Sequence, residues 1–326
     1  MNEPLERPLI SFVLIAYNQE MFIREAVEGA LAQTYSPLEI ILSDDCSSDR
    51  TFEVMREMAE SYQGRHSVRI RRCGTNMGIC RHLSLAVAEA HGLLYILSAG
   101  DDISAPQRTT VLYQAFLNSG GRARSIHSNF DAMDSYGKVL PGGFEPKCAP
   151  SLDNFLNRKF LSYGATQSVH REVFDFFGSL NCGVDEDNVL LHRALLLGEG
   201  VYVPERLVRV RMHSSSVSGG LRDNFSEGKQ LAYLSRRHLD GVIAWGSMIH
   251  DCCIYMQKKG ADGLKPENLT LLLRNMSQSI LMHFMATVPV KKAIIYIFPA
   301  IIKGVSLNKI AILIRKNFKA KRLRGT

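Results

Sequence analysis

Apolar and polar residues alternate with two different periods along the first hundred residues of the chain. Ile10 to Ala16 is an almost continuous apolar run, which is typical of a strand buried on both faces. It is followed, between residues 21 and 31, by apolar residues at helical spacing. The same two patterns then repeat, with strands expected at 38–42, 68–71 and 93–97 and helices at 51–62 and 82–91.

The short links between these segments predict a doubly wound, mostly parallel α/β sheet flanked by helices. Ligands of such sheets bind beyond the carboxyl ends of the strands, so the residues that follow each strand are candidates for chemistry. They are polar at three ends: Tyr17 and Asn18, Asp44 and Asp45, and Asp101 and Asp102. Because crowded carboxylates repel one another, this edge is expected to hold a metal ion or the donor groups of a ligand.

The later part of the chain is less regular and then becomes helical. Within it we expect a strand at 125–132, a Gly/Pro loop at 140–150 and a helix at 184–198. The pattern predicts an α/β domain over residues 1–220, in halves of about 1–105 and 106–220, and a helical C-terminal region over 221–326.

The charge of the chain is concentrated at its C-terminal end. No acidic residue follows Glu267, whereas eleven Lys and Arg residues do. The whole chain carries +7 and this tail +11, so residues 1–267 carry −4. The basic character therefore belongs to the tail, and we expect no nucleic acid as a partner.

The tail also contains an apolar run at residues 293–302, which is interrupted by Lys303. A helix that spans a membrane needs about 20 apolar residues, so this run is too short. Apolar residues interleaved with Lys and Arg favour a helix lying on an anionic membrane surface. The alternative is a helical appendage that packs on the α/β domain and exposes a basic face.

Seven cysteines are present, an odd number without a Cys-x-x-Cys pair. This usage favours reduced thiols in a cytosolic protein rather than a zinc site. The polar start, residues 1–8, lacks the pattern of a signal peptide. We expect a cytoplasmic protein that is peripheral on the inner face of the cytoplasmic membrane.

Several of these segments together resemble the family 2 glycosyltransferases, which have the GT-A fold. The resemblance is carried by residues 11–18, 30–35 and 39–49, then by Asn76-Met77-Gly78 and the segment 97–102, and finally by residues 186–193 and 208–213. It covers about residues 1–215. Each motif alone is a weak signal, but the ordered set is specific.

The resemblance implies a role for each matching position. Asp187 would be the general base, with Glu186 as its substitute. Asp101 and His213 would hold Mg²⁺ or Mn²⁺. The remaining positions would contact the donor nucleotide or its diphosphate: Ala16, Tyr17, Asn18, Asp45, Asn76, Arg81, Asp102 and Arg211.

The chain departs from the family pattern at three of these places. Ala99 stands where many members have the first acid of an Asp-x-Asp motif, which would remove one carboxylate from the metal site. Cys46 replaces the usual Gly after the paired aspartates, and His82 replaces a frequent Asn. The last two bear on donor preference.

Each assignment has a purely structural alternative. Asp45 could cap the helix that follows it, Asp101 and Asp102 could begin a helix, and Glu186 and Asp187 could be an acidic first turn. His213 could be an ordinary loop histidine and Arg81 a surface residue. Of two arginines that alternate in an expected strand, Arg209 and Arg211, we favour Arg211 as the one that faces the site.

What the resemblance implies is an inverting, metal-dependent transferase that moves a sugar from a nucleotide diphosphate sugar to a hydroxyl of a glycan or a lipid-linked acceptor. A divalent cation would neutralise the leaving diphosphate, and a single carboxylate would deprotonate the acceptor. The alternative is an inactive nucleotide-sugar-binding or scaffold protein of the same fold. A nicotinamide-dependent oxidoreductase is disfavoured, because no glycine follows the first strand within residues 16–21.

Overall fold

The computed structural model describes residues 7–143, 146–160, 163–183, 185–213, 227–260 and 264–287. The chain divides into two compact units. The first, here called the sheet unit, comprises Met1–Asn181 and Glu186–Gly220. The second, the helical unit, comprises Cys182–Asp185 and Leu221–Thr326.

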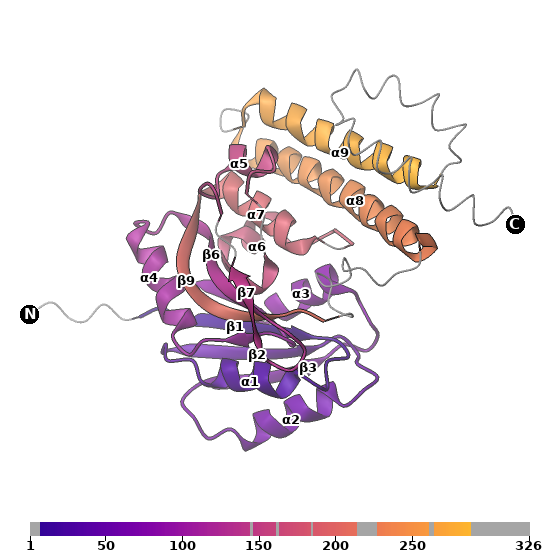
Figure 1. The fold of residues 1–326 in the computed structure, drawn as a ribbon. Coiled ribbons are helices and arrows are strands. Elements are labelled where there is room, and N and C mark those ends of the chain that lie inside the picture. The colour runs from indigo at the N-terminus through magenta and orange to yellow at the C-terminus, as the bar shows by residue number, and fades with distance from the viewer. Residues whose placement is uncertain are drawn as a thin grey trace, which may run out of the picture. The chain divides into compact units, whose positions relative to one another are not determined.

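A single nine-stranded sheet organises the sheet unit (Figure 1). Its order is β3-β2-β1-β4-β8-β6-β9-β5, and β7 pairs with β6 beside this path. The strands are β1 (Ile10–Ala16), β2 (Leu38–Asp44), β3 (Ser67–Arg72), β4 (Leu94–Ala99), β5 (Ile103–Ser104), β6 (Ala123–Met133), β7 (Val139–Gly143), β8 (Gln167–His170) and β9 (Glu199–Arg211).

The first half of this sheet agrees with the expectation from the sequence. Strands β3, β2, β1 and β4 are mutually parallel, as strand–helix–strand alternation requires. The helices between them are α1 (Ile23–Leu31), α2 (Thr51–Ser61) and α3 (Ile79–Val87). The last begins three residues earlier than expected, directly after Gly78, whose φ of 75° ends the preceding loop.

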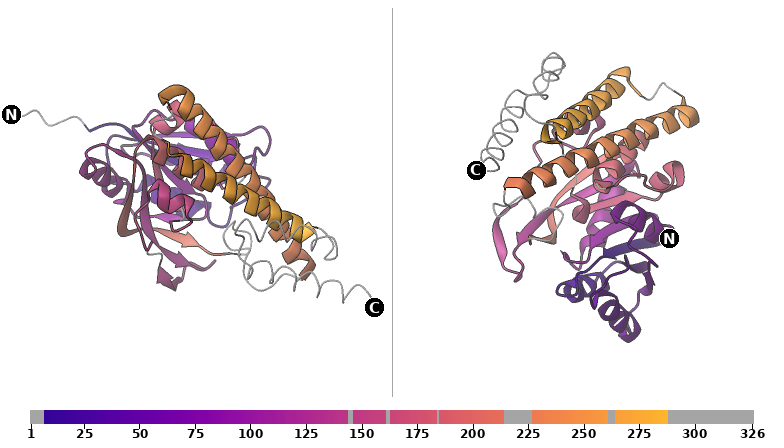
Figure 2. Two further views of the ribbon diagram at one scale, coloured as in Figure 1. Left: turned by 90° about the horizontal axis from the view of Figure 1, so that it is seen from above. Right: turned by 90° about the vertical axis from the view of Figure 1, so that its right-hand side faces the viewer.

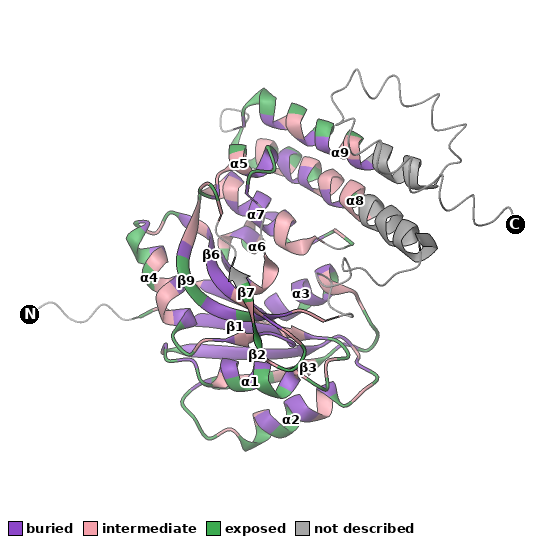
Figure 3. Cartoon of the chain, in the orientation of Figure 1, coloured by how far each residue is buried: buried purple, intermediate pink, exposed green. Residues whose placement is uncertain are grey.

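Burial explains the continuous apolar runs. Strands β1 and β2 are buried along almost their whole length, whereas α2 is buried along one side only (Figure 3). One hydrophobic core joins the face of β1 that carries Phe12 and Leu14 to α1, α2 and α4 (Arg108–Asn118). Helix α3 lies on the opposite face of the sheet and contacts β1 and β2 (Figure 1).

The second half of the sheet is mixed, which the sequence pattern did not predict. Strand β8 lies between β4 and β6 and is antiparallel to both, and β5 is antiparallel to β9. Strands β6 and β9 are parallel, with Phe130 opposite Val208 and Met133 opposite Arg211. The expected loop at 140–150 is wrong at its start, because Val139–Gly143 forms β7. The remaining elements of this half are α5 (Leu152–Leu156), the 3₁₀ turn η1 (Gly164–Thr166), α6 (Glu172–Phe177) and α7 (Glu186–Leu197), of which α7 packs on β6, β8 and β9.

The helical unit contains two long helices, α8 (Glu227–Lys259) and α9 (Pro266–Thr287). They run side by side and bury Ala244, Met248 and Leu272 (Figure 2). Within the described residues no helix has both the length and the apolarity needed to cross a bilayer. The apolar run at 293–302 and the basic residues from Lys291 onward lie outside the described residues.

The expectation of seven reduced thiols is wrong for two of them. Cys80 and Cys182 are each disulfide-bonded, whereas Cys46, Cys73, Cys148, Cys252 and Cys253 are not in disulfides. Disulfide formation depends on the separation of Cβ atoms in space, which the spacing of cysteines along a chain does not reveal.

Candidate active site

The carboxyl ends of the parallel strands bring the predicted acids to one edge of the sheet. Asp45 directly follows β2, and its N–H donates to the carbonyl of Ala16 at the end of β1 (2.9 Å). On the other side of β1, Asp101 follows β4, where the N–H of Gly100 donates to the carbonyl of Ile15 (3.0 Å). The two acids therefore flank the end of β1, as predicted.

The loop after β1 is tied to the loop after β2 by side chains. The Asn18 Oδ1 atom accepts the N–H of Ser48 (2.8 Å), and the N–H of Asn18 donates to Ser47 Oγ (2.9 Å). Glu20 Oε2 accepts the N–H of Arg50 (3.0 Å). Asn18 has a φ of 52°, a conformation that asparagine tolerates better than most residues. The predicted nucleotide contact Asn18 thus also shapes the edge, while Tyr17 beside it is exposed.

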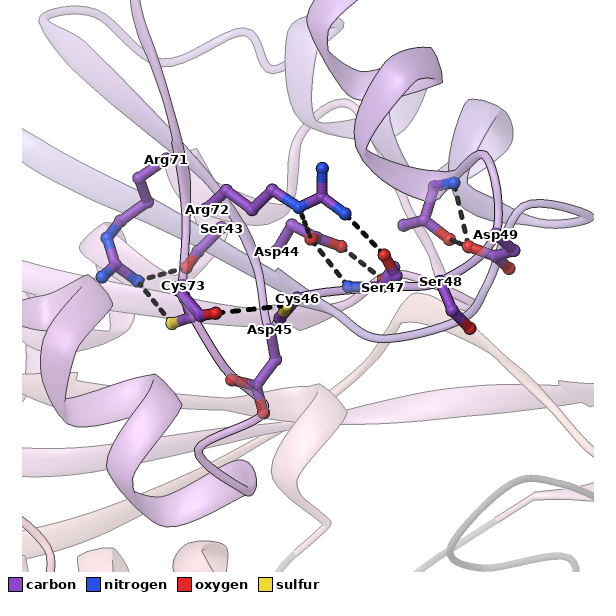
Figure 4. Close-up of polar contacts among 12 residues, drawn as sticks. Ser43, Asp44, Asp45, Cys46, Ser47, Ser48, Asp49, Arg71, Arg72 and Cys73 are labelled. Atoms are coloured by element: carbon purple, nitrogen blue, oxygen red, sulfur yellow. Dashed lines mark hydrogen bonds and ion pairs between the residues drawn. The ribbon is translucent and has the colours of Figure 1, made fainter.

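The two adjacent aspartates have different partners (Figure 4). Asp44 is fully buried, accepts hydrogen bonds from Ser47 and forms an ion pair with Arg72 (3.3 Å). The carboxylate of Asp45 accepts the N–H groups of Met77 (2.8 Å) and Gly78 (2.9 Å). Asp45 therefore does not cap α2.

Asp49 lies nearer to that helix, and its Oδ1 accepts the N–H of Thr51, the first residue of α2 (3.0 Å). Asp45 is thereby left to organise the segment around Asn76. Asn76 and Arg81, both predicted nucleotide contacts, are exposed there.

Next to Asp45 lies a polar cluster formed by three buried residues, Ser43, Cys73 and His82, and the partly buried Arg71. Arg71 Nη1 donates to Ser43 Oγ (2.6 Å), and His82 Nε2 lies 2.6 Å from the same oxygen. Burial lowers the pKa of His82 to about 4, although the nearby Asp45 carboxylate opposes this shift. Neutral His82 can accept a hydrogen bond from the Ser43 hydroxyl, and the Ser43 oxygen in turn accepts one from Arg71. The hydroxyl of Ser43 thus has both a donor and an acceptor within the cluster.

The acids after β4 are buried and crowded. Asp101 Oδ2 lies 2.9 Å from His213 Nε2, two residues beyond the end of β9. Asp102 Oδ1 accepts the N–H of Arg211 (2.8 Å). Burial and the adjacent Asp101 carboxylate raise the pKa of Asp102 well above its ordinary value, against the effect of Arg211 and Arg108. The sheet therefore brings the two predicted metal ligands, Asp101 and His213, into direct contact.

This pair fits a divalent cation better than the other candidate group. Carboxylate oxygen and imidazole nitrogen are both ligands of such ions, and a cation would relieve the crowding of Asp101 with Asp102. Asp45, Cys73 and His82 also offer ligand atoms within 4.8 Å of one another. The Arg71 guanidinium, 3.8 Å from Cys73 Sγ, would repel a cation there, and both Asp45 oxygens accept backbone N–H groups.

Arg211 has partners that the sequence did not predict. Its side chain is 1% exposed and donates to the carbonyls of Asp101 and Ser135 and to the carboxylate of Glu25. Its guanidinium also lies over the ring of Phe22. Arg209, the alternative, is exposed.

The predicted base lies at the start of α7, beside the 3₁₀ turn η1. A Cβ atom added to Gly164 would lie 3.3 Å from Glu186 Oε1 and 3.4 Å from Asp187 Cβ. Gln167 Nε2 donates to the backbone carbonyl of Asp187 (3.4 Å). Gly164 therefore packs closely against both acids, and a side chain at this position would crowd them.

Four residues of this region were not predicted. Arg108 is fully buried and ties β4 to η1, because it donates to the carbonyls of Leu97 (2.8 Å) and Ala165 (2.7 Å). The others are Phe22, Glu25 and Arg71. The apolar spacing of residues 21–31 indicates only that Phe22 belongs to a helix. Nothing in the local sequence indicates a role for Glu25 or Arg71, because their partners are distant along the chain.

Known proteins with similar sequences and folds include glycosyltransferases, which agrees with acids gathered at the carboxyl edge of the sheet. The family model described as "Glycosyl transferase family 2" matches residues 11–145. An uncharacterized glycosyltransferase of Haemophilus influenzae is 30% identical over 233 residues, which are 65% of this chain and 68% of that protein. The chain belongs to glycosyltransferase family 2. The first curated relatives are matched over half of their length or less, namely 50% and 27%.

Two further similarities extend over most of this family 2 glycosyltransferase. The succinoglycan biosynthesis protein ExoO of Rhizobium meliloti is 27% identical over 261 residues, 75% of this chain and 69% of that protein. The mannosyltransferase PcManGT of Pyrobaculum calidifontis, solved with GDP-Man and Mn²⁺, superimposes with a TM-score of 0.54 at 14% identity, covering 99% of this chain and 90% of that one. That likeness shows the fold, which is the GT-A fold that the resemblance implied.

Proposed function

We propose that this chain transfers a sugar from a nucleotide diphosphate sugar to an acceptor hydroxyl with inversion at the anomeric carbon. The proposal rests above all on the contact between Asp101 and His213 at the carboxyl edge of the sheet (2.9 Å). A divalent cation bound there would supply a Lewis acid for the two phosphates of the donor. Mg²⁺ and Mn²⁺ both suit an oxygen-rich set of ligands.

The nucleotide is proposed to lie along the edge formed by Ala16, Tyr17, Asn18 and Asp45. Ala16 is buried at the strand end, and Tyr17 beside it is half exposed, so its ring is available to a base. Asp45 is held by two backbone N–H groups. Its carboxylate keeps further acceptor capacity for N–H groups of a nucleobase.

Asp187 is proposed to be the general base, with Glu186 as its substitute. Its carboxylate would take the proton of the acceptor hydroxyl while that oxygen forms a bond to C1 of the sugar. The bond between C1 and the diphosphate oxygen breaks at the same time, and the electron pair leaves with the diphosphate. One base and in-line attack give inversion, by analogy with glycoside hydrolysis.

The acceptor is proposed to be a glycan or lipid-linked glycan of a surface polysaccharide. Support comes from the similarity to ExoO, a succinoglycan biosynthesis protein. The basic tail would bring the enzyme to an anionic membrane surface on the cytoplasmic side, where such an acceptor is embedded. This part of the proposal depends on the sequence of residues 268–326, which contains eleven basic and no acidic residues.

A thermal-shift screen of nucleotide diphosphate sugars, with and without Mn²⁺, tests the proposal. A donor that binds the folded state raises the melting temperature by mass action. We expect Asp45→Ala to abolish this shift and Asp101→Ala to remove its dependence on metal. Asp175→Asn is a matched control, because Asp175 is exposed in an ion pair with Arg171.

The role of Asp187 is tested by turnover. Asp187→Asn should keep the donor-induced shift and stop transfer. If that variant turned over at the normal rate, Asp187 would be excluded as the base, and Glu186→Gln would then identify the substitute.

A further inference from the structure

Arg211 is the most heavily bonded side chain at the candidate cation site. Its Nε donates to the carbonyl of Asp101 (3.0 Å), and its Nη1 donates to the carbonyls of Ser135 (3.2 Å) and Asp134 (3.4 Å). Its Nη2 donates to Glu25 Oε2 (3.0 Å). Since these acceptors belong to the protein and the side chain is 1% exposed, most of its donors are unavailable to a diphosphate.

Arg211 contacts one proposed cation ligand, Asp101, directly and reaches the other, His213, through the ring of Phe22. It holds Asp101 through the backbone carbonyl of that residue, and its own N–H fixes Asp102 Oδ1 (2.8 Å). Its guanidinium lies 4.7 Å from the ring centroid of Phe22, and that ring lies 4.9 Å from the ring of His213. Contacts thus run from Asp101 through Arg211 and Phe22 to His213. His213 Nε2 in turn lies 2.9 Å from Asp101 Oδ2, so the four residues form a closed ring of contacts.

Charge alone does not explain this arrangement. A guanidinium beside a cation site opposes binding of the cation, because like charges repel more strongly where water is excluded. Glu25, in the first turn of α1, offsets that charge through an ion pair of 3.0 Å. The pair therefore offsets part of the guanidinium charge while keeping the five-donor geometry of arginine, which lysine cannot reproduce.

We propose that Arg211, held by Glu25 and Phe22, is a positioning residue that fixes Asp101 and His213 in the separation a divalent cation needs. The inference rests on the proposed function, because it assigns the cation to that pair. It replaces direct contact with the diphosphate as the role of Arg211. Glu25 does not contact the cation ligands and acts through Arg211, by fixing the orientation of its guanidinium.

The test is a titration of the purified full chain with Mn²⁺, in which free Mn²⁺ is measured by electron paramagnetic resonance. Arg211→Lys and Glu25→Gln should each weaken Mn²⁺ binding by about tenfold, the lower end of the effect usual for residues that support metal ligands. The matched controls are Arg209→Lys on the same strand and Glu28→Gln on the same helix, both exposed and both expected to bind as wild type does.

The direction of the change separates this role from a purely electrostatic one. If Arg211 acted only through its charge, Arg211→Gln would bind Mn²⁺ more tightly, and Arg211→Lys would be unchanged; either result overturns the proposal. Because Glu25→Gln also removes a negative charge, Glu25→Asp is added, which keeps that charge and shortens the side chain that holds Arg211. Glu25 is half exposed, so Glu25→Asp should fold normally and still bind Mn²⁺ more weakly; unchanged binding by this variant overturns the proposal even if an Arg211 variant does not fold. For Glu25→Gln, high Mn²⁺ should restore turnover, because a loss of affinity is compensated by concentration whereas general misfolding is not.

Failure of the proposed cation site gives a different result. If wild type itself bound no Mn²⁺, the assignment of the cation to Asp101 and His213 would fall, and this inference with it. If wild type and both variants bound equally well, the cation site would stand and only the positioning role would be refuted.

Discussion

His82 provides the sharpest prediction about stability, because its imidazole is 2% exposed and lies 2.6 Å from Ser43. Burial lowers the pKa of His82 from 6.5 to about 4 in the folded chain. A histidine with a lowered pKa binds fewer protons when folded than when unfolded. The stability that neutral, buried His82 contributes to the folded chain is therefore fully present above pH 6.5 and is lost as the pH falls toward 4.

The size of this effect follows from the two pKa values. At pH 5 the unfolded histidine is almost fully protonated, whereas the folded one, with a pKa of about 4, is mostly neutral. The free energy of unfolding should fall by about 2 kcal/mol between pH 7 and pH 5 because of His82 alone, at about 1.4 kcal/mol per pKa unit. Other buried groups titrate in the same range, so the quantity to measure is the difference between wild type and a His82 variant.

Urea unfolding followed by circular dichroism at pH 7 and pH 5 gives that difference. His82→Gln keeps an amide that can reach Ser43 and removes the titration, so it should lose about 2 kcal/mol less than wild type over this range. His250→Gln, at an exposed position on α8, is the control and should lose as much as wild type. Equal losses for wild type and His82→Gln would refute the reasoning and show that His82 is protonated in the folded state.

Three other changes have expected outcomes. Gly92→Ala would place a Cβ atom 2.4 Å from the backbone nitrogen of Ser11, and urea unfolding should show a loss of roughly 1–3 kcal/mol or more. Arg108→Met would leave the buried carbonyls of Leu97 and Ala165 without their donor and should cost roughly 3 kcal/mol in the same assay. Gly164→Ala would bring a methyl group within 3.3 Å of Glu186 Oε1, so kcat should fall while the donor-induced thermal shift persists; an unchanged kcat would argue against substrate approaching there.

The parallel half of the sheet could be predicted because the pattern of each strand and helix is set by residues close together in the sequence. Strands such as β1 are buried on both faces and must be continuously apolar, and the helices between them must show apolar residues at helical spacing. The position of Asp45 and Asp101 at one edge of the sheet followed from the same reasoning, since the carboxyl ends of parallel strands meet there.

The mixed half could not be predicted in this way. Strand β8 has four residues and β5 has two, which is too short for a period to appear in the sequence. Their pairing partners are distant along the chain: Val169 of β8 lies opposite Ser125 of β6, and Ser104 of β5 opposite Val208 of β9. Long-range pairing of this kind is set by tertiary packing rather than by local pattern.

The same distinction holds at the candidate site. The sequence indicated which acids lie at the edge, but the side chains that hold them come from remote segments. Glu25 and Arg211 are 186 residues apart and form one ion pair, and Asp45 binds backbone groups 32 and 33 residues away. Such partners become visible only when the folded chain brings them together.

The side-chain bonds between the loops after β1 and β2 have a consequence for how this chain can be altered. The side chains of Asn18 and Glu20 accept the backbone N–H groups of Ser48 and Arg50, and the N–H of Gln19 donates to Thr51 Oγ1 at the start of α2. Replacing the loop after β1 would remove the Asn18 and Glu20 acceptors, whereas Ser48 and Arg50 take part through backbone N–H groups that any residue except proline retains. Chimaeras intended to change the preferred nucleotide should therefore keep Asn18 and Glu20, or acceptors of the same reach, in any loop placed after β1, whereas the side chains at 48 and 50 can be exchanged more freely.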